Sequence, residues 1–161
     1  MSVLASKRTE SKFEVIVQAN VIQNLITDLV SRRLGIKDPR SLVRKHYGTS
    51  EIPEEIYAKY MVALQTSREQ LETLACLLTN NIVSANSIYP TSMHEYELRR
   101  DKQNEALINC YQIIKELQHV IDIFNVDVNK YAEISKAINR EIGLIKKWRQ
   151  TDNKIKSHLL Q

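Results

Sequence analysis

The chain has 161 residues, of which 43% are hydrophobic and 26% charged, and its net charge is +4. These proportions are typical of one globular domain, so neither a disordered chain nor a two-domain enzyme is expected. Three glycines and three prolines are too few for the many turns of a β-sandwich or barrel, or for a glycine-rich phosphate loop. The composition therefore disfavours all-β folds and nucleotide-binding α/β folds.

The first predicted helix follows a segment, residues 1–10, that we expect to be a flexible tail. Ser11 and Glu14 have the spacing of a capping box. Apolar residues then recur at helical intervals, at Phe13, Val17, Val21, Leu25 and Leu29, backed by Ile16, Ile22, Ile26 and Val30. The helix is expected to stop at Gly35, because glycine is favoured just past a helix end.

A short helix is predicted inside the connector of residues 36–52, between Asp38 and Tyr47, with Gly48 at its end. The second long helix begins at Pro53, because proline and the two glutamates that follow it suit a first helical turn. Its apolar positions are Ile56, Tyr60, Leu64, Ser67, Leu71, Leu74, Ala75, Leu78 and Ile82. The helix is expected to stop before the proline at position 90.

Two more long helices follow. The third begins after a second capping box, Ser92 and Glu95, and the fourth begins after Asp127, which can cap it. The third helix has its apolar face at Ala106, Leu107, Cys110, Ile113, Ile114, Leu117, Val120, Ile121 and Phe124. The fourth has it at Tyr131, Ile134, Ile138, Ile142, Ile145 and Trp148. Tyr131 and Trp148 are expected to anchor this helix, Trp148 against the first helix or a neighbouring subunit.

Four amphipathic helices with short connections can bury their apolar faces only against one another. The sequence therefore predicts an all-α fold, an antiparallel up-down-up-down four-helix bundle over residues 11–150. Residues 151–161 are expected to form a frayed C-terminal extension. No segment has the pattern of a signal peptide or the ~18 apolar residues of a membrane span. We therefore expect a cytoplasmic protein with no membrane partner.

Signatures of catalysis and metal binding are largely missing. The histidines are spread over different elements, at His46, His94, His119 and His158. Glu116 and His119 have the Glu-x-x-His spacing of di-iron carboxylate bundles, but that architecture needs two such motifs and this pair points away from the apolar face. Cys76 and Cys110 fall inside apolar stripes, where they are expected to be reduced core residues. The prediction is a non-enzymatic protein with no catalytic residue, no metal and no cofactor.

Charge is distributed unevenly: residues 1–50 and 126–161 are basic, and the segments between them are acidic. In an up-down bundle one end would collect cations from three helices, namely Lys7, Arg8, Lys12, Arg99, Arg100, Lys102, Lys146, Lys147, Arg149, Lys154 and Lys156, diluted by Glu95, Glu97, Asp101 and Asp152. The helix dipole accounts for cations at a helix C-terminus, but not for Arg99, Arg100 and Lys102 early in the third helix. A phosphate backbone or an acidic protein face would account for them. A second cluster, at the opposite end, consists of Arg32, Arg33, Lys37, Arg40, Arg44 and Lys45.

Short segments in the second half of the chain resemble a known family. They are Ile88-Tyr89-Pro90-Thr91, Glu95-Tyr96-Glu97-Leu98-Arg99-Arg100 with Gln103, Ala106 and Asn109-Cys110, then Glu116-Leu117-Gln118, Val126-Asp127-Val128-Asn129-Lys130-Tyr131, and Leu144-Ile145-Lys146-Lys147-Trp148-Arg149 with Asp152-Asn153. Over roughly residues 82–154 the chain resembles the accessory variability determinant, a four-helix-bundle protein encoded beside the reverse transcriptase of diversity-generating retroelements. The resemblance implies a non-enzymatic homopentamer that binds the reverse transcriptase and its template RNA and supports mutagenic cDNA synthesis.

The first functional hypothesis is therefore an accessory protein that binds polymerase and RNA. Its expected contact residues are Arg99, Arg100, Lys102, Lys146, Lys147, Arg149 and Lys154. The second hypothesis is a generic helical adaptor without nucleic-acid binding, whose outward tyrosines form the contact surface. RNA binding that weakens steeply with salt would favour the first over the second. A third, a carboxylate-metal oxidase, would be revealed by stoichiometric iron or manganese in the purified protein.

Overall fold

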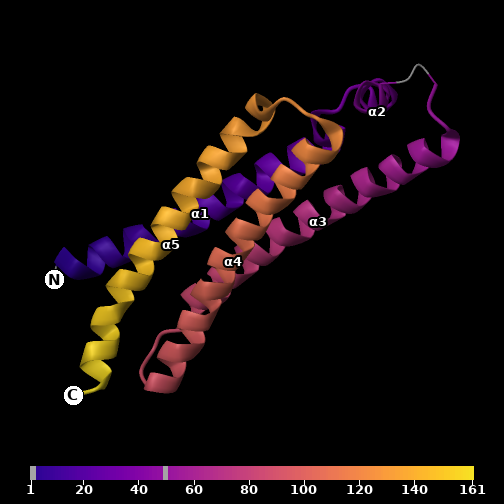
Figure 1. Ribbon diagram of the computed structural model, residues 1–161. Coiled ribbons are helices and arrows are strands. Elements are labelled where there is room, and N and C mark those ends of the chain that lie inside the picture. Colours follow the sequence, from indigo (N-terminus) through magenta and orange to yellow (C-terminus); the bar gives the residue numbers. More distant parts are fainter. Residues whose placement is uncertain (1–2, 49–50) are drawn as a thin grey trace.

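The computed structural model describes residues 3–48 and 51–161, with side chains except those of residues 3–13 and 46. The predicted contacts of Lys7, Arg8 and Lys12 therefore lie outside the described side chains. The described residues form five α-helices and two short 3₁₀ segments, and they contain no strand, which confirms the all-α prediction. The elements are α1 (Val3–Ser31), η1 (Arg33–Gly35), α2 (Pro39–Tyr47), α3 (Glu54–Ser87), α4 (Met93–Phe124), η2 (Val128–Tyr131) and α5 (Ala132–Leu159) (Figure 1).

The four long helices pack side by side as a helical bundle, and α2 lies beyond them beside the start of α3 (Figure 1). Helix α1 contacts α3 and α5, and α4 contacts the same two helices. One end of the α1–α5 contact is fixed by the Tyr131 hydroxyl, which donates to the Leu34 carbonyl over 2.8 Å. Farther along, Gln18 Nε2 donates to the Ala137 carbonyl over 3.0 Å. These bonds join segments about a hundred residues apart in the sequence.

The helix ends marked by Asp38, Gly48 and Ser92 lie where the sequence predicts them, whereas Ser11 and Glu14, the predicted capping box of the first helix, lie inside α1. The Asp38 carboxylate accepts from the Arg40 amide at the start of α2, and Gly48 ends that helix in the left-handed conformation, with φ +68°. At the start of α4 the Ser92 hydroxyl accepts from the Glu95 amide. The Glu95 carboxylate accepts in return from the Thr91 amide over 2.7 Å. These contacts satisfy amide groups that a helix start leaves without partners.

Two helix ends differ from expectation. Helix α1 begins at Val3, so residues 3–10 are helical and not a tail. Helix α5 continues to Leu159, so the predicted frayed extension of residues 151–161 is wrong. Neither stretch contains a glycine or proline that would stop a helix. The last turns of α5 are in addition held by Asp152, which is buried against α4.

The buried face of α1 is also offset from the predicted one. Val17 and Val21 are 43% and 41% exposed, and Leu25 and Leu29 are only partly buried. The core face consists of Val15, Ala19, Ile22, Ile26 and Val30. Because apolar residues cover more than half of the circumference of α1, periodicity alone could not select the face that its neighbours α3 and α5 cover.

The other helices place their predicted apolar faces in one core. On α5, Tyr131, Ile134, Ile138, Ile142, Ile145 and Trp148 are all buried. The predicted face of α4 is buried or packed against the core from Ala106 to Phe124. Cys110 is buried as predicted, but Cys76 is exposed on α3, so that prediction was wrong. Its neighbour Ala75 takes the core position.

Candidate nucleic-acid interface

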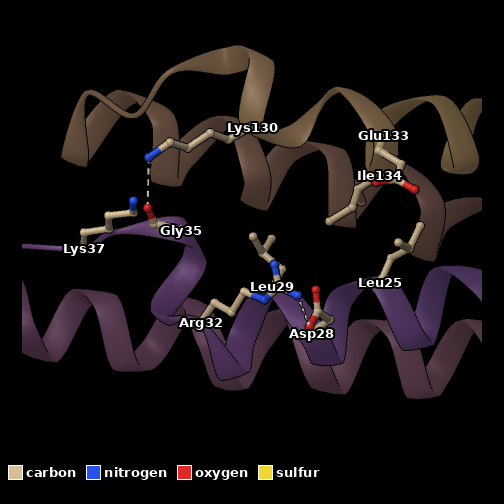
Figure 2. A pocket seen from close by; sticks show the side chains of 9 residues that line it. All are labelled: Leu25, Asp28, Leu29, Arg32, Gly35, Lys37, Lys130, Glu133 and Ile134. Atoms are coloured by element: carbon tan, nitrogen blue, oxygen red, sulfur yellow. Dashed lines mark hydrogen bonds and ion pairs between the residues drawn. The ribbon is translucent and has the colours of Figure 1, made fainter.

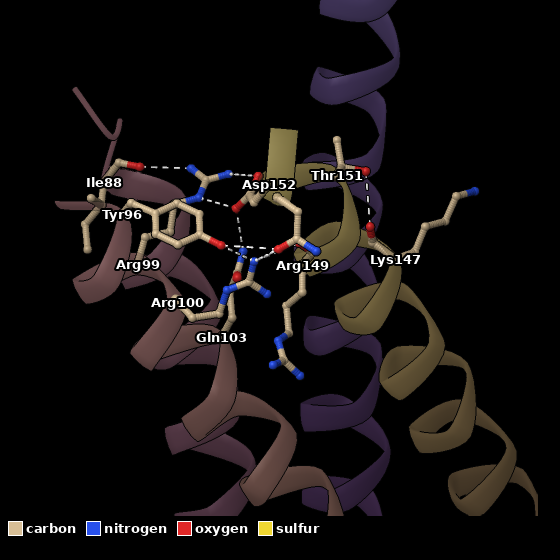
Figure 3. Close-up of polar contacts among 10 residues, drawn as sticks. Ile88, Tyr96, Arg99, Arg100, Gln103, Lys147, Arg149, Thr151 and Asp152 are labelled. Atoms are coloured by element: carbon tan, nitrogen blue, oxygen red, sulfur yellow. Dashed lines mark hydrogen bonds and ion pairs between the residues drawn. The ribbon is translucent and has the colours of Figure 1, made fainter. Parts of the chain in front are cut away.

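Arg99, a predicted phosphate contact, lies inside the bundle with 1% of its surface exposed. Its Nε and Nη2 donate to the two Asp152 oxygens over 2.6 and 2.9 Å, and its Nη1 donates to the Ile88 carbonyl over 2.9 Å (Figure 3). The guanidinium also lies 5.1 Å from the centre of the Trp148 ring. All three guanidinium nitrogens thus bind acceptors of the same chain. The prediction of an external contact for Arg99 was therefore wrong.

Arg100 and Lys102 are also engaged within the chain. Arg100 Nη2 donates to the Tyr96 hydroxyl, the Asn153 side chain and the Arg149 carbonyl, over 2.6, 2.6 and 2.8 Å. Lys102 Nζ forms an ion pair with Glu105 over 2.7 Å. Arg100 is half-buried between α4 and the end of α5. Of the three cations early in α4, none projects freely from the bundle.

Arg99, Arg100, Gln103, Asp152 and Asn153 form what we call the α4–α5 clamp. Gln103 Nε2 donates to Asp152 Oδ2 over 2.8 Å, so this carboxylate is held by two side chains of α4. From the sequence, Asp152 is predicted to be an exposed carboxylate that offsets part of the positive charge of the basic cluster. The overlooked signal is periodicity: Arg99 and Gln103 continue the buried stripe of α4, and Asp152 continues that of α5.

Beyond Glu133, the carboxylates of α5 are buried and most of its cations are exposed. The two carboxylates that follow, Glu141 and Asp152, are 0% and 3% exposed. The cations lie on the outside, where Arg149 is half-buried and the others are exposed. We call the surface formed by six of these seven cations, without Lys156, the α5 basic face; it consists of Lys136, Arg140, Lys146, Lys147, Arg149 and Lys154. Four of the seven contact residues expected from the sequence belong to it.

Few of these cations are neutralised. Arg140 forms an ion pair with Glu14 over 2.9 Å. The ammonium groups of Lys146, Lys147 and Lys154 form no ion pair or hydrogen bond with the described side chains, and Figure 3 shows the Lys147 side chain pointing away from the α4–α5 clamp. Because α5 continues to Leu159, Lys146 and Lys147 lie in the middle of the helix, where its dipole does not favour cations. The dipole explanation for them therefore no longer holds.

Glu141 adds no negative charge to this surface at neutral pH. Its two carboxylate oxygens are buried and form no hydrogen bond with the described residues. Burial raises the pKa of the Glu141 carboxyl to about 9, helped by the negative charge of Glu14 and opposed by Arg140. The carboxyl is therefore protonated at pH 7. It lies near Cys110, whose thiol pKa burial raises to about 12, so this thiol is a poor nucleophile.

The opposite end of the bundle carries the second predicted cluster of cations. A groove of about 380 Å³ lies there between the end of α1 and the start of α5. Figure 2 shows Leu25, Leu29 and Ile134 among its lining residues. Its cations are partly neutralised, since Arg32 pairs with Asp28 over 3.0 Å and Lys130 donates to the Gly35 carbonyl over 2.9 Å. Arg40 is likewise paired, with Glu54. Arg33, Lys37, Arg44 and Lys45 are exposed at this end and form no ion pair with the described side chains, so the structure has a second basic surface here.

The residues considered for metal binding do not come together in the described part of the chain. No group of three His, Cys, Asp or Glu side chains there could hold a metal ion. Glu116 is half-buried and His119 is exposed on the outer side of α4. In the same residues, no helix is both long enough and apolar enough to cross a membrane. Comparison with known proteins gives no matching family model, no matching curated protein and no matching solved structure.

Proposed function

We propose that the chain is an up-down-up-down four-helix bundle that binds nucleic acid through the α5 basic face. In this proposal it is a non-enzymatic, cytoplasmic accessory protein of a retroelement reverse transcriptase and its template RNA. The observation that carries the proposal is the division of charge on α5. From Ile134 to the end of the helix every carboxylate is buried, while the cations face outward. Solubility alone does not require a surface of cations without carboxylates, because a surface with charges of both signs is also soluble.

The dimensions of the α5 basic face suit a phosphate backbone. At about 1.5 Å per residue, Lys136 and Lys154 lie ~27 Å apart along the helix. Phosphates of one duplex strand follow each other every ~3.4 Å, so this length corresponds to about eight phosphates. Each cation that reaches a phosphate releases a counterion and makes binding more sensitive to salt. Nucleic acid is therefore a better match than a small anion, which would need a pocket.

The polymerase partner and the homopentamer come from the family resemblance. Several of the residues that carry this resemblance meet in the α4–α5 clamp: Tyr96 and Arg100 bond Asn153, and Arg99 bonds Asp152. They are residues that hold two helices together, so the resemblance supports a shared bundle architecture most directly. The exposed apolar residues Val17 and Val21 on α1 are the kind of surface that a subunit interface would cover.

The test replaces Lys146 and Lys147 together by glutamate. We expect binding to a single-stranded RNA, with and without the reverse transcriptase, to weaken at least tenfold at 100 mM salt. The matched control is Lys59→Glu with Lys115→Glu, two exposed lysines on α3 and α4 that make the same change in net charge. Equal losses in both double variants would show that only total charge matters, and would overturn the proposed site. Helix content should be unchanged in both.

A helical adaptor without nucleic-acid binding is the second candidate. It is favoured by exposed apolar side chains on the outside of α4, where Ile108 is 53% and Tyr111 49% exposed. Such residues are common in protein interfaces. The salt series separates the two functions: the adaptor predicts no RNA binding even at low salt. Replacing Ile108 and Tyr111 by serine would then disrupt a protein complex and leave RNA binding unaffected.

A further inference from the structure

Gly143 is the one glycine inside a long helix in the described part of the chain, and no contact of the described side chains explains it. Its backbone is helical, unlike that of Gly35 and Gly48, which have positive φ. A Cβ atom built on Gly143 would meet no other atom within 4 Å. Neither backbone conformation nor internal packing therefore requires glycine here. Glycine in a helix interior destabilises the helix relative to alanine. Gly143 therefore lowers the stability of α5, and no contact with the described side chains compensates for this.

The position of Gly143 on the helix is informative. Lys136, Arg140, Gly143, Lys147 and Lys154 follow one another at intervals of four, three, four and seven residues. Such intervals place residues on one line along an α-helix. Gly143 thus lies in the middle of the α5 basic face, with Arg140 one turn before it and Lys147 one turn after it. At this point the helix backbone itself is open to solvent.

We propose that Gly143 is the point of closest approach between α5 and a bound nucleic-acid strand. The phosphodiester backbone lies against the bare helix there, and Lys147 binds a phosphate on one side of it, while Arg140, which is paired with Glu14, borders the other side. This inference rests on the proposed function. It adds that residue 143 determines how closely the nucleic-acid strand can approach the backbone of α5. Glycine serves elsewhere for close approach of a ligand to a protein backbone, because it has no Cβ to hold the ligand away.

Charge and hydropathy favour a phosphate backbone over a protein helix as the occupant. A helix that docks against a glycine gap usually buries apolar side chains around it. No large apolar side chain between Ala132 and Leu159 is exposed among the described residues. The charged residues beside the gap are Lys146, Lys147 and Arg140, the last of which is paired with Glu14. The surface thus offers positive charge and space, and little for an apolar partner.

The test compares Gly143→Ala and Gly143→Gln in the full chain, with a 12-nucleotide single-stranded RNA as the probe. We expect Gly143→Ala to raise the melting temperature by about 2–4 °C and to weaken RNA binding about threefold. Gly143→Gln should weaken binding at least tenfold. Both variants keep every charge, so the salt dependence should change little. In Gly143→Ala the melting temperature then rises while the affinity for RNA falls. A variant that bound RNA less well because it was partly unfolded would show a lower melting temperature.

The control is Thr73→Gln, which adds bulk at an exposed position of α3 and should leave RNA binding within twofold. If the lysine double variant weakens binding but Gly143→Gln does not, the inference about Gly143 is overturned and the proposed function stands. If neither variant weakens binding, both are overturned. If Gly143→Gln instead abolishes self-association measured by light scattering, with RNA binding unchanged, the gap takes a second copy of this chain and the inference is wrong.

Discussion

Glu141 is a protonatable group in a place where only its neutral form is stable. Its carboxyl has no hydrogen-bond partner in the described part of the chain, and its pKa is about 9 in the folded state against 4.5 as the ordinary value. Between these two values the folded chain holds a proton that the unfolded chain releases. Stability is therefore greatest below pH 4.5 for this group, and it falls as the pH rises toward 9. The slope is up to about 1.4 kcal/mol per pH unit.

We predict that Glu141→Gln removes most of this pH dependence and stabilises the protein at pH 8. Glutamine has nearly the same shape and cannot ionise, so the desolvation of a charge no longer opposes folding. Urea unfolding at pH 5 and pH 8 gives the measurement. Glu133→Gln, at an exposed position of the same helix, is the control and should behave like the unmodified chain. Unfolding energies of the unmodified chain that are equal at both pH values would contradict the buried, protonated state.

The residue scale is also where the sequence was least informative about the candidate site. The helix dipole disfavours cations at a helix start, which predicts external partners for Arg99, Arg100 and Lys102. The dipole contributes only ~0.3–1 kcal/mol per charge, and a buried two-point contact with a carboxylate easily exceeds it. Which carboxylate lies opposite Arg99 depends on the register of α4 against α5. That register is set by packing over the whole bundle and cannot be obtained from local spacing.

At the scale of elements, the predictable helix ends are those with a local chemical marker. Asp38, Gly48 and Ser92 act within two or three residues of their own position, so the sequence was sufficient. The end of α5 has no such marker, and the capping-box spacing of Ser11 and Glu14 is misleading, because α1 begins before it at Val3. For α5 the deciding contact is Asp152 with Arg99, 53 residues away in the sequence. Long-range contacts of this kind override the weak tendency of an unmarked helix end to fray.

The α4–α5 clamp leads to a prediction about the end of α5. Asp152→Asn leaves the Arg99 guanidinium buried without its counter-charge, which we expect to cost about 3–5 kcal/mol. Amide hydrogen exchange should also become faster in residues 150–159, because the helix loses its anchor there. Urea unfolding and exchange followed by mass spectrometry measure the two effects. The control Asp101→Asn removes an exposed carboxylate from α4 and should change stability by less than about 0.5 kcal/mol.

A second variant distinguishes charge from shape in the same clamp. Replacing both partners, Arg99→Met with Asp152→Leu, removes the buried charges and keeps apolar volume. We expect this double variant to be more stable than Asp152→Asn alone, since a buried ion pair is often matched by well-packed apolar residues. If the double variant were the less stable one, the hydrogen bonds to Ile88 and Gln103 would be the main source of stability. The ion pair would then be secondary.

For the whole molecule, the net charge is weakly positive, and folding distributes the charged residues unevenly over the surface. The net charge is only +4, which by itself indicates little about partners. Folding buries Glu141 and Asp152, and the second of these also neutralises Arg99. Beyond Glu133, the charged residues that remain exposed on α5 are cations, and they continue over several turns. Sequence composition could give the total charge, but the direction of each side chain follows from which face the other helices cover.

The length and salt dependence of RNA binding test this surface as a unit. Lys136, Lys146, Lys147 and Lys154 form no ion pair with the described residues, so four cations are free to contact phosphates. With about 0.7 counterions released per contact on a single strand, the slope of log affinity against log salt should be about −3. Affinity should rise steeply between four and about eight nucleotides, the ~27 Å length of the α5 basic face, and rise little beyond it. Fluorescence anisotropy with labelled oligonucleotides of 4 to 16 nucleotides gives both quantities.

In the variant with Lys146→Glu and Lys147→Glu, the slope should become shallower by about 1.4. A slope that is the same for both proteins, or an affinity that does not depend on length, would mean that the strand does not lie along α5.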